Sequence, residues 1–111
     1  MGEYFDPEDL KRFGKIGEHA APLAEDFFNY YGKATGSDGA LSKREKSLIA
    51  LAIAHSEQCP YCIDAYTTAC LESGANPEQM TEAVHVAAAM KAGITLVHAT
   101  QMQKHLKKLV L

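Results

Sequence analysis

The sequence lacks an apolar run long enough to cross a membrane, and it lacks an excess of basic residues. A transmembrane helix needs about 18–20 apolar residues, and His85 and Lys91 interrupt the best candidate segment. The formal net charge of -3 over 111 residues gives no reason to expect nucleic acid or an anionic membrane as a partner. The first residues, MGEYFDPED, have neither the basic nor the apolar region of a signal peptide. We therefore expect a cytoplasmic protein.

Cysteine is scarce, and strand patterns are almost absent. Three cysteines, an odd number without a secretory signal, argue against a structural disulfide framework. The chain has no internal repeat, linker or low-complexity segment, and its 47% hydrophobic and 23% charged residues are near the average for soluble globular proteins. Chains of this length usually hold one core. Residues 1–111 are therefore predicted to form a single all-α domain.

Helix caps and breakers divide the chain into about six helices. They are expected over about residues 7–19, 21–34, 43–55, 60–73, 77–92 and 94–109. Ser42 with Glu45 predicts a capping box at the start of the third helix, and Asn76 with Gln79 predicts one at the start of the fifth. Gly93 is expected to break or kink the chain between the last two helices.

Two of these helices have no polar side. Every residue from Leu48 to Ala54 is apolar, and His85 is the one polar residue between Ala83 and Ala89. A helix that is apolar all round must be covered on every side, and a domain of this size buries only about two-thirds of its surface. The pattern favours a homo-oligomer, although a tightly wrapped monomer is the alternative.

The segment HSEQCPYCIDAY, residues 55–66, contains a Cys-x-x-Cys pair. With Cys59 at the N-cap, Pro60 occupies the first helical position and Cys62 the third. Both sulfurs then lie beside unpaired backbone N–H groups at the positive end of the helix dipole, which favours the nucleophilic thiolate. Side chains at this spacing are ~5–6 Å apart at Cβ, whereas a disulfide needs ~3.5–4.5 Å. A disulfide should therefore form but reduce readily, as a redox pair requires.

A zinc site and inert packing are the alternatives for this pair. Cys-x-x-Cys is half of many zinc sites, and His55 or His85 could supply further ligands. However, no second pair follows at the usual spacing, so no metal or cofactor is predicted. Cys70 lies too far along the same helix to join and is expected to be a small buried hydrophobe.

The stretch REKSLIALAIAHSEQCPYCIDAYTTACLESGANPEQMTEAVHVAA resembles the core of the carboxymuconolactone decarboxylase family, over about residues 42–100. It looks closest to the alkylhydroperoxidase D-like branch, and within it to the arsenosugar biosynthesis-associated peroxidase-like proteins. The resemblance implies a compact helical bundle that assembles as a trimer or hexamer. It also implies reduction of a hydroperoxide substrate: Cys62 attacks the peroxide, Cys59 resolves the sulfenic acid, and an external dithiol reduces the disulfide.

The sequence departs from the family's proton relay at two positions. Ser47 stands where the family has a glutamate, and Tyr66 where it has a histidine. A phenol is a poor base at neutral pH. His55 lies on the same helical stripe as Ser47 and is the candidate base, while Tyr66, one turn past Cys62, is a candidate site residue. Further possible lining residues are His85, Ser47, Glu45 and Glu57.

Three functions fit the sequence. The first is a thiol-dependent peroxidase or disulfide oxidoreductase that uses Cys59 and Cys62. The second is a non-enzymatic dithiol accessory protein that binds a soft ligand such as trivalent arsenic. The third is lactone decarboxylation, which does not require a cysteine pair.

Tyr30 and Tyr31 are interpreted as ordinary helix residues.

Overall fold

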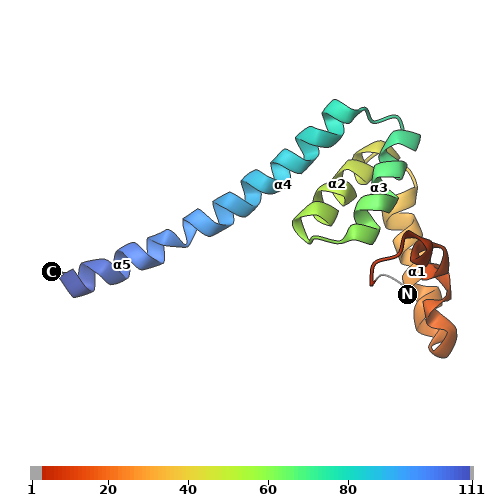
Figure 1. Cartoon of the computed structure of the whole chain (residues 1–111), viewed down its shortest axis with the longest axis horizontal. Helices are drawn as coiled ribbons and strands as arrows, with labels where there is room; N and C mark the ends of the chain where they lie inside the picture. The colour runs from red at the N-terminus through yellow and green to blue at the C-terminus, as the bar shows by residue number, and fades with distance from the viewer. Residues whose placement is uncertain (1–3, 111) are drawn as a thin grey trace.

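The computed structural model describes residues 4–110, and over this range the chain is all-helical (Figure 1). The prediction of an all-α fold is therefore confirmed. The elements are a 3-10 helix, η1 (Pro7–His19), and the α-helices α1 (Ala21–Gly36), α2 (Lys43–Ser56), α3 (Pro60–Glu72), α4 (Pro77–Val97) and α5 (Ala99–Val110).

The predicted caps define the starts of α2 and α4. The Ser42 side chain accepts the Glu45 N–H, and the Glu45 carboxylate accepts the Ser42 N–H. Asn76 and Gln79 make the same reciprocal pair at the start of α4. Gly74, after α3, has φ +93, the left-handed conformation that commonly follows a helix C-terminus. These ends agree with the sequence-based prediction.

The prediction of a break at Gly93 is wrong. α4 continues through Gly93 to Val97, and the chain leaves regular helix at His98 before α5 begins. A glycine keeps its backbone N–H and costs a helix only about 1 kcal/mol relative to alanine. A strongly apolar helix can therefore include it.

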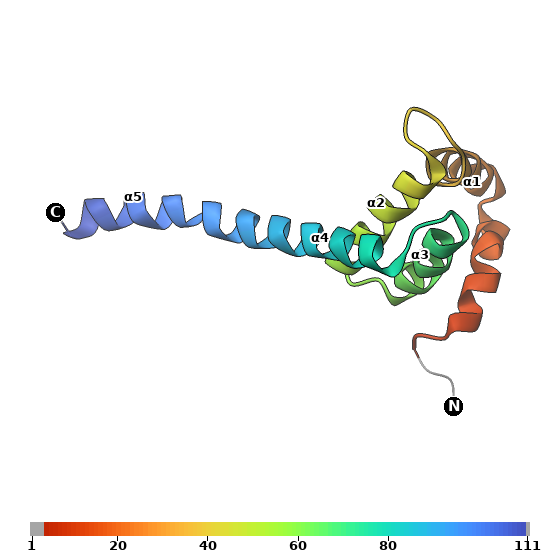
Figure 2. The same ribbon diagram turned by 90° about the horizontal axis from the view of Figure 1, so that it is seen from above.

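The body of the molecule consists of η1, α1, α2, α3 and the first turns of α4 (Figure 2). α2 packs against both α3 and α4, α1 lies beside α2 and η1, and η1 also contacts α3. Leu51, Cys70 and Ala75 form the buried cluster. Partly buried residues that pack against this cluster are Leu48, Tyr66 and Met80. Cys70 is 0% exposed, which confirms its predicted role as a buried hydrophobe.

The remainder of α4 and all of α5 project from the body (Figure 1). We call residues 83–110 the arm. The radius of gyration is 19.0 Å, whereas a compact chain of this length has about 13 Å. The protomer by itself is therefore not the compact bundle that was expected, because the apolar part of α4 leaves the body instead of being wrapped by it. Within residues 4–110, none of the helices is both long and apolar enough to cross a membrane.

Candidate active site

The cysteine pair lies where α2 turns into α3. Gln58 has φ 55, a left-handed conformation that reverses the chain, and the Cys59 N–H donates to the Ala54 carbonyl at 2.9 Å. Cys59 then becomes the N-cap of α3, and its Sγ accepts the Cys62 N–H at 3.3 Å. The predicted placement of both cysteines at the helix start is confirmed.

Both thiols are free and half-buried, but their electrostatics differ from the expectation. Burial, a hydrogen bond with Cys59 and the charge of Cys59 raise the pKa of Cys62 to about 11. The prediction that Cys62 gives up its proton easily is therefore wrong, because desolvation of the sulfur, the largest cause of the raised pKa, favours the neutral thiol. Cys62 is a thiol at neutral pH.

A cavity of about 510 Å³ opens at the cysteine pair. η1, α1 and α3 contribute its walls. The lining residues are Asp9, Leu10, Arg12, Phe13, Ile16, Tyr31, Cys59, Tyr61, Cys62, Ala65 and Tyr66. Apart from one carboxylate and one guanidinium, these side chains are apolar or aromatic. The arrangement can therefore hold an organic molecule against two sulfurs.

Two tyrosine hydroxyls meet in this cavity. Tyr66, one turn after Cys62 on α3, forms a hydrogen bond with the hydroxyl of Tyr31 on α1. The Tyr31 ring lies among aromatic rings, with centroids 5.3 Å from Phe27 and 6.1 Å from Phe13. Burial, the bond to Tyr66 and the charges of Tyr66 and both cysteines raise the pKa of Tyr31.

Sequence reasoning missed Tyr31. Its spacing from Phe27 signalled only an apolar helix face. The packing of α1 beside α2 and η1 brings its hydroxyl to Tyr66, and no local motif encodes that packing.

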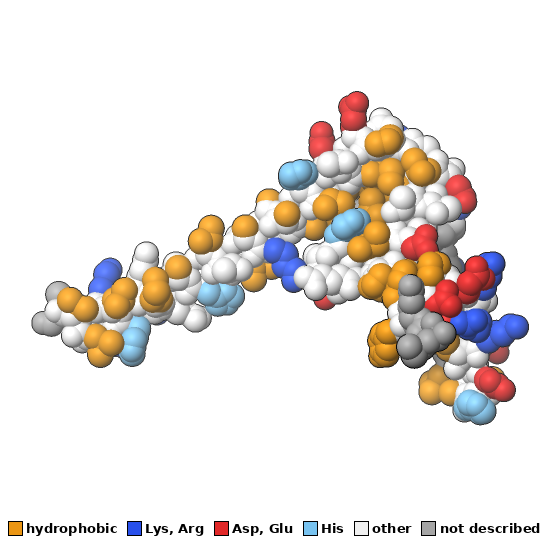
Figure 3. All heavy atoms as spheres, viewed as in Figure 1, with side chains coloured by type: hydrophobic (Ala, Val, Ile, Leu, Met, Phe, Trp, Pro, Cys, Tyr) orange, Lys and Arg blue, Asp and Glu red, His pale blue; other side chains and the backbone are white. Residues whose placement is uncertain are grey.

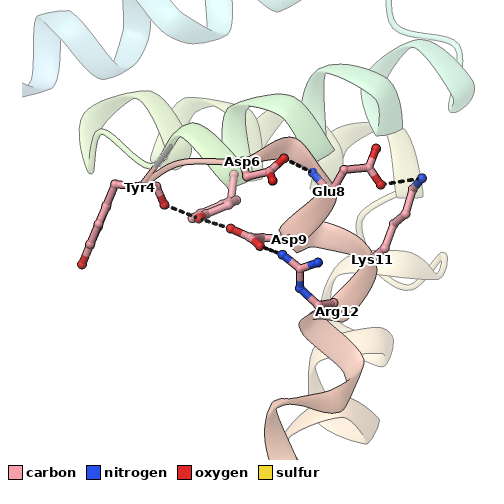
Figure 4. A network of polar contacts seen from close by, with 7 residues as sticks. Tyr4, Asp6, Glu8, Asp9, Lys11 and Arg12 are labelled. Carbon is pink, nitrogen blue, oxygen red and sulfur yellow. Dashed lines mark hydrogen bonds and ion pairs between the residues drawn. The ribbon is translucent and has the colours of Figure 1, made fainter. Parts of the chain in front are cut away.

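η1 is held across the start of α3 by a polar network. The Tyr61 hydroxyl donates to Asp9 Oδ2 at 2.7 Å, with the Tyr4 carbonyl as a second acceptor at 3.2 Å. Asp9 also pairs with Arg12 (Figure 4). The Phe5 ring lies 4.7 Å from the Tyr61 ring between centroids. These contacts place η1 as one wall of the cavity.

The candidate base, His55, does not line this cavity. It is half-buried near the end of α2, and its Nδ1–H donates to the Leu51 carbonyl at 2.9 Å. This bond is the ordinary one for a histidine at the end of its own helix, and it leaves Nε2 as the nitrogen that could accept a proton. Catalysis by His55 stays a prediction.

The four possible lining residues lie elsewhere in residues 4–110. Ser47 is 1% exposed in the core. Glu45 is exposed in the capping box, where hydrogen bonds from Ser42 lower its pKa. Glu57 is exposed at the end of α2, and His85 is exposed on α4. Of the predicted site residues, the structure brings Cys59, Cys62 and Tyr66 together.

No group of three or more His, Cys, Asp and Glu side chains is placed to hold a metal ion among the residues that the structure describes.

Comparisons with known proteins agree with this architecture. The sequence model of the carboxymuconolactone decarboxylase family matches residues 22–104. An uncharacterized protein of the cox locus of Paracoccus denitrificans is 42% identical over 101 residues, covering 91% of this chain and 90% of the relative. An uncharacterized protein of Cupriavidus necator is 32% identical over 91 residues, covering 82% and 80%.

A solved structure is also similar. The crystal structure of a carboxymuconolactone decarboxylase family protein from Legionella pneumophila, in its apo form, superposes with a TM-score of 0.67 and 28% identity. The superposition covers 91% of this chain and 89% of that protein.

Proposed function

Because the chain belongs to the carboxymuconolactone decarboxylase family, which includes both decarboxylases and alkylhydroperoxidases, we propose that it is a thiol-dependent oxidoreductase. Cys59 and Cys62 cycle between dithiol and disulfide as they reduce a hydroperoxide. The observation that carries this proposal is the contact at the start of α3: the Cys62 N–H donates to Cys59 Sγ, and both side chains line one cavity. The apolar walls of that cavity suit the organic part of a hydroperoxide.

The chemistry takes three steps. A thiolate attacks one peroxide oxygen, the O–O bond breaks, and the products are a sulfenic acid and an alkoxide that takes up a proton. The second sulfur then displaces the hydroxyl of the sulfenic acid as water, which forms the disulfide. An external dithiol finally reduces this disulfide by exchange and restores both thiols.

The order of attack follows the family resemblance, with one condition set by the structure. Cys62 attacks and Cys59 resolves. Because the pKa of Cys62 is about 11, its proton has to leave before or during the attack. When Cys59 is in its thiolate form, its sulfur, which hydrogen-bonds with the Cys62 side chain, can receive that proton, and otherwise the proton leaves to solvent. The pair is therefore proposed to act as a unit.

One observation favours a second candidate function. A thiol with a raised pKa reacts slowly with peroxide, but two adjacent half-buried thiols can still chelate a soft ion such as trivalent arsenic. Lactone decarboxylation has less support. The ionic lining of the cavity is one pair, Asp9 with Arg12, so the cavity offers no net positive charge to a polyanionic lactone.

Titration of free thiols before and after one equivalent of cumene hydroperoxide tests the proposal. In the wild type, the number of free thiols should fall from three to one. In the Cys59→Ser and Cys62→Ser variants, which both keep Cys70, it should stay at two once any sulfenic acid has been reduced with arsenite. Cys70→Ser is the matched control and should lose both of its remaining thiols. Three titratable thiols after peroxide treatment would contradict the proposed function.

Calorimetry with sodium arsenite separates the second candidate. Stoichiometric binding that either cysteine substitution removes, together with an unchanged thiol count after peroxide, would favour the dithiol accessory protein over the enzyme.

A further inference from the structure

The proposed reduction of a hydroperoxide releases an alkoxide, and that alkoxide needs a proton. An alcohol is a far weaker acid than a phenol, whose pKa is ~10, so the alkoxide is a poor leaving group by itself. The O–O bond breaks faster when a nearby acid donates a proton to the departing oxygen. The identity of this donor rests on the proposed function, which involves the two sulfurs and leaves the other side chains of the cavity without a role.

Histidine, a common general acid in proteins, is absent from the cavity. Within residues 4–110, none of the histidines lines the cavity at the cysteine pair. The histidines visible in Figure 3 are spread over the arm and the body instead of gathering at one place. His55 donates its Nδ1–H to the Leu51 carbonyl at the end of its own helix. The proton donor therefore has to be found among the side chains that share the cavity with the cysteines.

The polar network at the η1 wall is unsuited to this task. Arg12 carries a guanidinium that keeps its protons at any ordinary pH, and it pairs with Asp9. The Tyr61 hydroxyl donates to Asp9 Oδ2 at 2.7 Å, so its proton is already engaged. The other two hydroxyls that line the cavity belong to Tyr31 and Tyr66.

Tyr66 is held beside the cysteine pair by two sets of contacts. It follows Cys62 by four residues on α3, so the two side chains lie on the same face of that helix. The Tyr66 side chain packs against the buried cluster of the body, and its hydroxyl forms a hydrogen bond with the hydroxyl of Tyr31. Packing and hydrogen bonding together hold this hydroxyl in the cavity that contains both sulfurs.

The surroundings of Tyr31 give the hydroxyl pair a direction. Burial, the bond to Tyr66 and the charges of Tyr66 and both cysteines raise the pKa of Tyr31. Tyr31 therefore keeps its proton and can donate it to the Tyr66 oxygen. A hydroxyl has one hydrogen to donate, so in this arrangement the hydrogen of Tyr66 is available to a molecule in the cavity.

We propose that Tyr66, supported by Tyr31, is the general acid that protonates the departing alkoxide. The Cys62 thiolate forms a bond to one peroxide oxygen, the O–O bond breaks, and the other oxygen takes the Tyr66 proton and leaves as an alcohol. The sulfur is oxidised by two electrons and the peroxide is reduced by two. Tyr31 then donates its proton to the Tyr66 oxygen, and solvent restores the proton on Tyr31. Tyr66 is thus a catalytic residue, and Tyr31 is a positioning residue that acts through it.

The choice of oxidant tests the acid role of Tyr66. Cumene hydroperoxide releases an alkoxide, whereas peracetic acid releases acetate, a weak base that leaves without a proton. In single-turnover reactions, Tyr66→Phe should slow reduction of cumene hydroperoxide ~100-fold and change reduction of peracetic acid by less than ~3-fold. Quenched flow with thiol titration measures both rates. Their ratio within one variant cancels any change in the ionisation of Cys62, because the same thiolate attacks both oxidants.

Two further tyrosine substitutions separate the supporting hydroxyl from its neighbourhood. Tyr31→Phe keeps the ring but removes the bond to Tyr66, so the Tyr66 phenolate that forms on proton transfer loses its donor. This variant should show the same selectivity for cumene hydroperoxide with a smaller loss, ~10-fold. Tyr30→Phe, on the 72% exposed neighbour of Tyr31, is the matched control and should equal the wild type with both oxidants.

Cys59 is the competing proton donor, because its sulfur lies beside Cys62. Cys59→Ala removes this proton and should change the first step by the same factor with both oxidants, since Tyr66 still protonates the alkoxide. A loss confined to cumene hydroperoxide in Cys59→Ala, with no such selectivity in Tyr66→Phe, would assign the proton to Cys59 and overturn the role of Tyr66.

A purely structural role for the hydroxyl pair predicts a different pattern. Equal slowing with both oxidants in Tyr66→Phe, or no slowing with either, would overturn the acid role while leaving the cysteine chemistry intact. A wild type in which Cys59 and Cys62 react with neither oxidant would instead overturn the proposed function.

Discussion

The body and the arm use similar apolar residues with opposite results. In the body, Leu51 is 2% exposed against Cys70 and Ala75, whereas in the arm Leu96 is 70% exposed. The body encloses its own core and shapes a cavity around two sulfurs. The arm encloses nothing within the protomer and carries charge opposite to that of the body. The comparison teaches that an all-round apolar helix indicates where burial is needed, but not which chain provides it.

The largest expected effect concerns the chemistry in the body. Cys62→Ser should lower peroxide turnover with a dithiol reductant by at least ~1,000-fold, because the attacking sulfur is gone, whereas Cys59→Ser should lose the internal disulfide and leave a sulfenic acid that only the external thiol removes. Cys70→Ser should leave turnover within ~2-fold, since Cys70 lies in the core away from the cavity. A coupled assay with dithiothreitol and cumene hydroperoxide measures these rates. Equal turnover in all three variants would mean that the reaction does not depend on Cys59 and Cys62.

Stability sharpens the comparison between the two regions. Leu51→Ala should lower the free energy of unfolding by ~3 kcal/mol, because it leaves a cavity in the buried cluster. Leu96→Ala, in the arm, should cost a dilute protomer less than ~1 kcal/mol, since the side chain is already largely exposed. Urea denaturation at several protein concentrations measures both. A comparable loss from Leu96→Ala in the dilute protomer would mean that the arm is already packed there.

The pH dependence of alkylation tests the electrostatics of the cysteine pair. The thiolate is the reactive form, and the pKa of Cys62 is raised from 9.0 to about 11. Alkylation of Cys62 by iodoacetamide should therefore rise ~10-fold for each pH unit from neutrality until it levels off at about pH 11. In Cys59→Ser the rate at pH 8 should increase, because the charge that opposes ionisation of Cys62 is gone. Mass spectrometry of the tryptic peptide follows the reaction, and a plateau near pH 9 would contradict the raised pKa.

The smallest effect concerns the η1 wall of the cavity. Tyr61→Phe removes the hydroxyl that donates to Asp9, which should destabilise the attachment of η1 by ~1 kcal/mol. Hydrogen exchange should accelerate in η1 amides while the amides of α2 keep their protection. Phe5→Leu, which keeps the hydroxyl but removes the ring contact with Tyr61, separates the hydrogen bond from the packing. Unchanged exchange in Tyr61→Phe would show that the hydroxyl contributes nothing to the wall.

Local chemistry explains which parts of the structure the sequence could predict. The capping pairs at Ser42 and Asn76 and the N-cap position of Cys59 depend on neighbours within a few residues, and the structure contains them all. The continuation of α4 through Gly93 was not predictable, because a single glycine lowers helix propensity without preventing a helix.

Tertiary packing explains what was missed at the site. The Tyr31 hydroxyl reaches Tyr66, 35 residues away in the sequence, only because α1 packs beside α2 and η1. The raised pKa of Cys62 depends on burial by η1, α1 and α3 and on the neighbouring sulfur, none of which a Cys-x-x-Cys motif specifies. Helix-dipole reasoning alone gave the opposite direction.

Peptide mapping of the protein after one equivalent of hydroperoxide tests the central claim most directly. Non-reducing digestion and mass spectrometry should yield one oxidised species, with Cys59 joined to Cys62 and Cys70 still a free thiol, and dithiothreitol should reverse it. Oxidation confined to Cys70, or a Cys59 and Cys62 that both remain reduced while peroxide persists, would show that the pair at the start of α3 is not a redox centre.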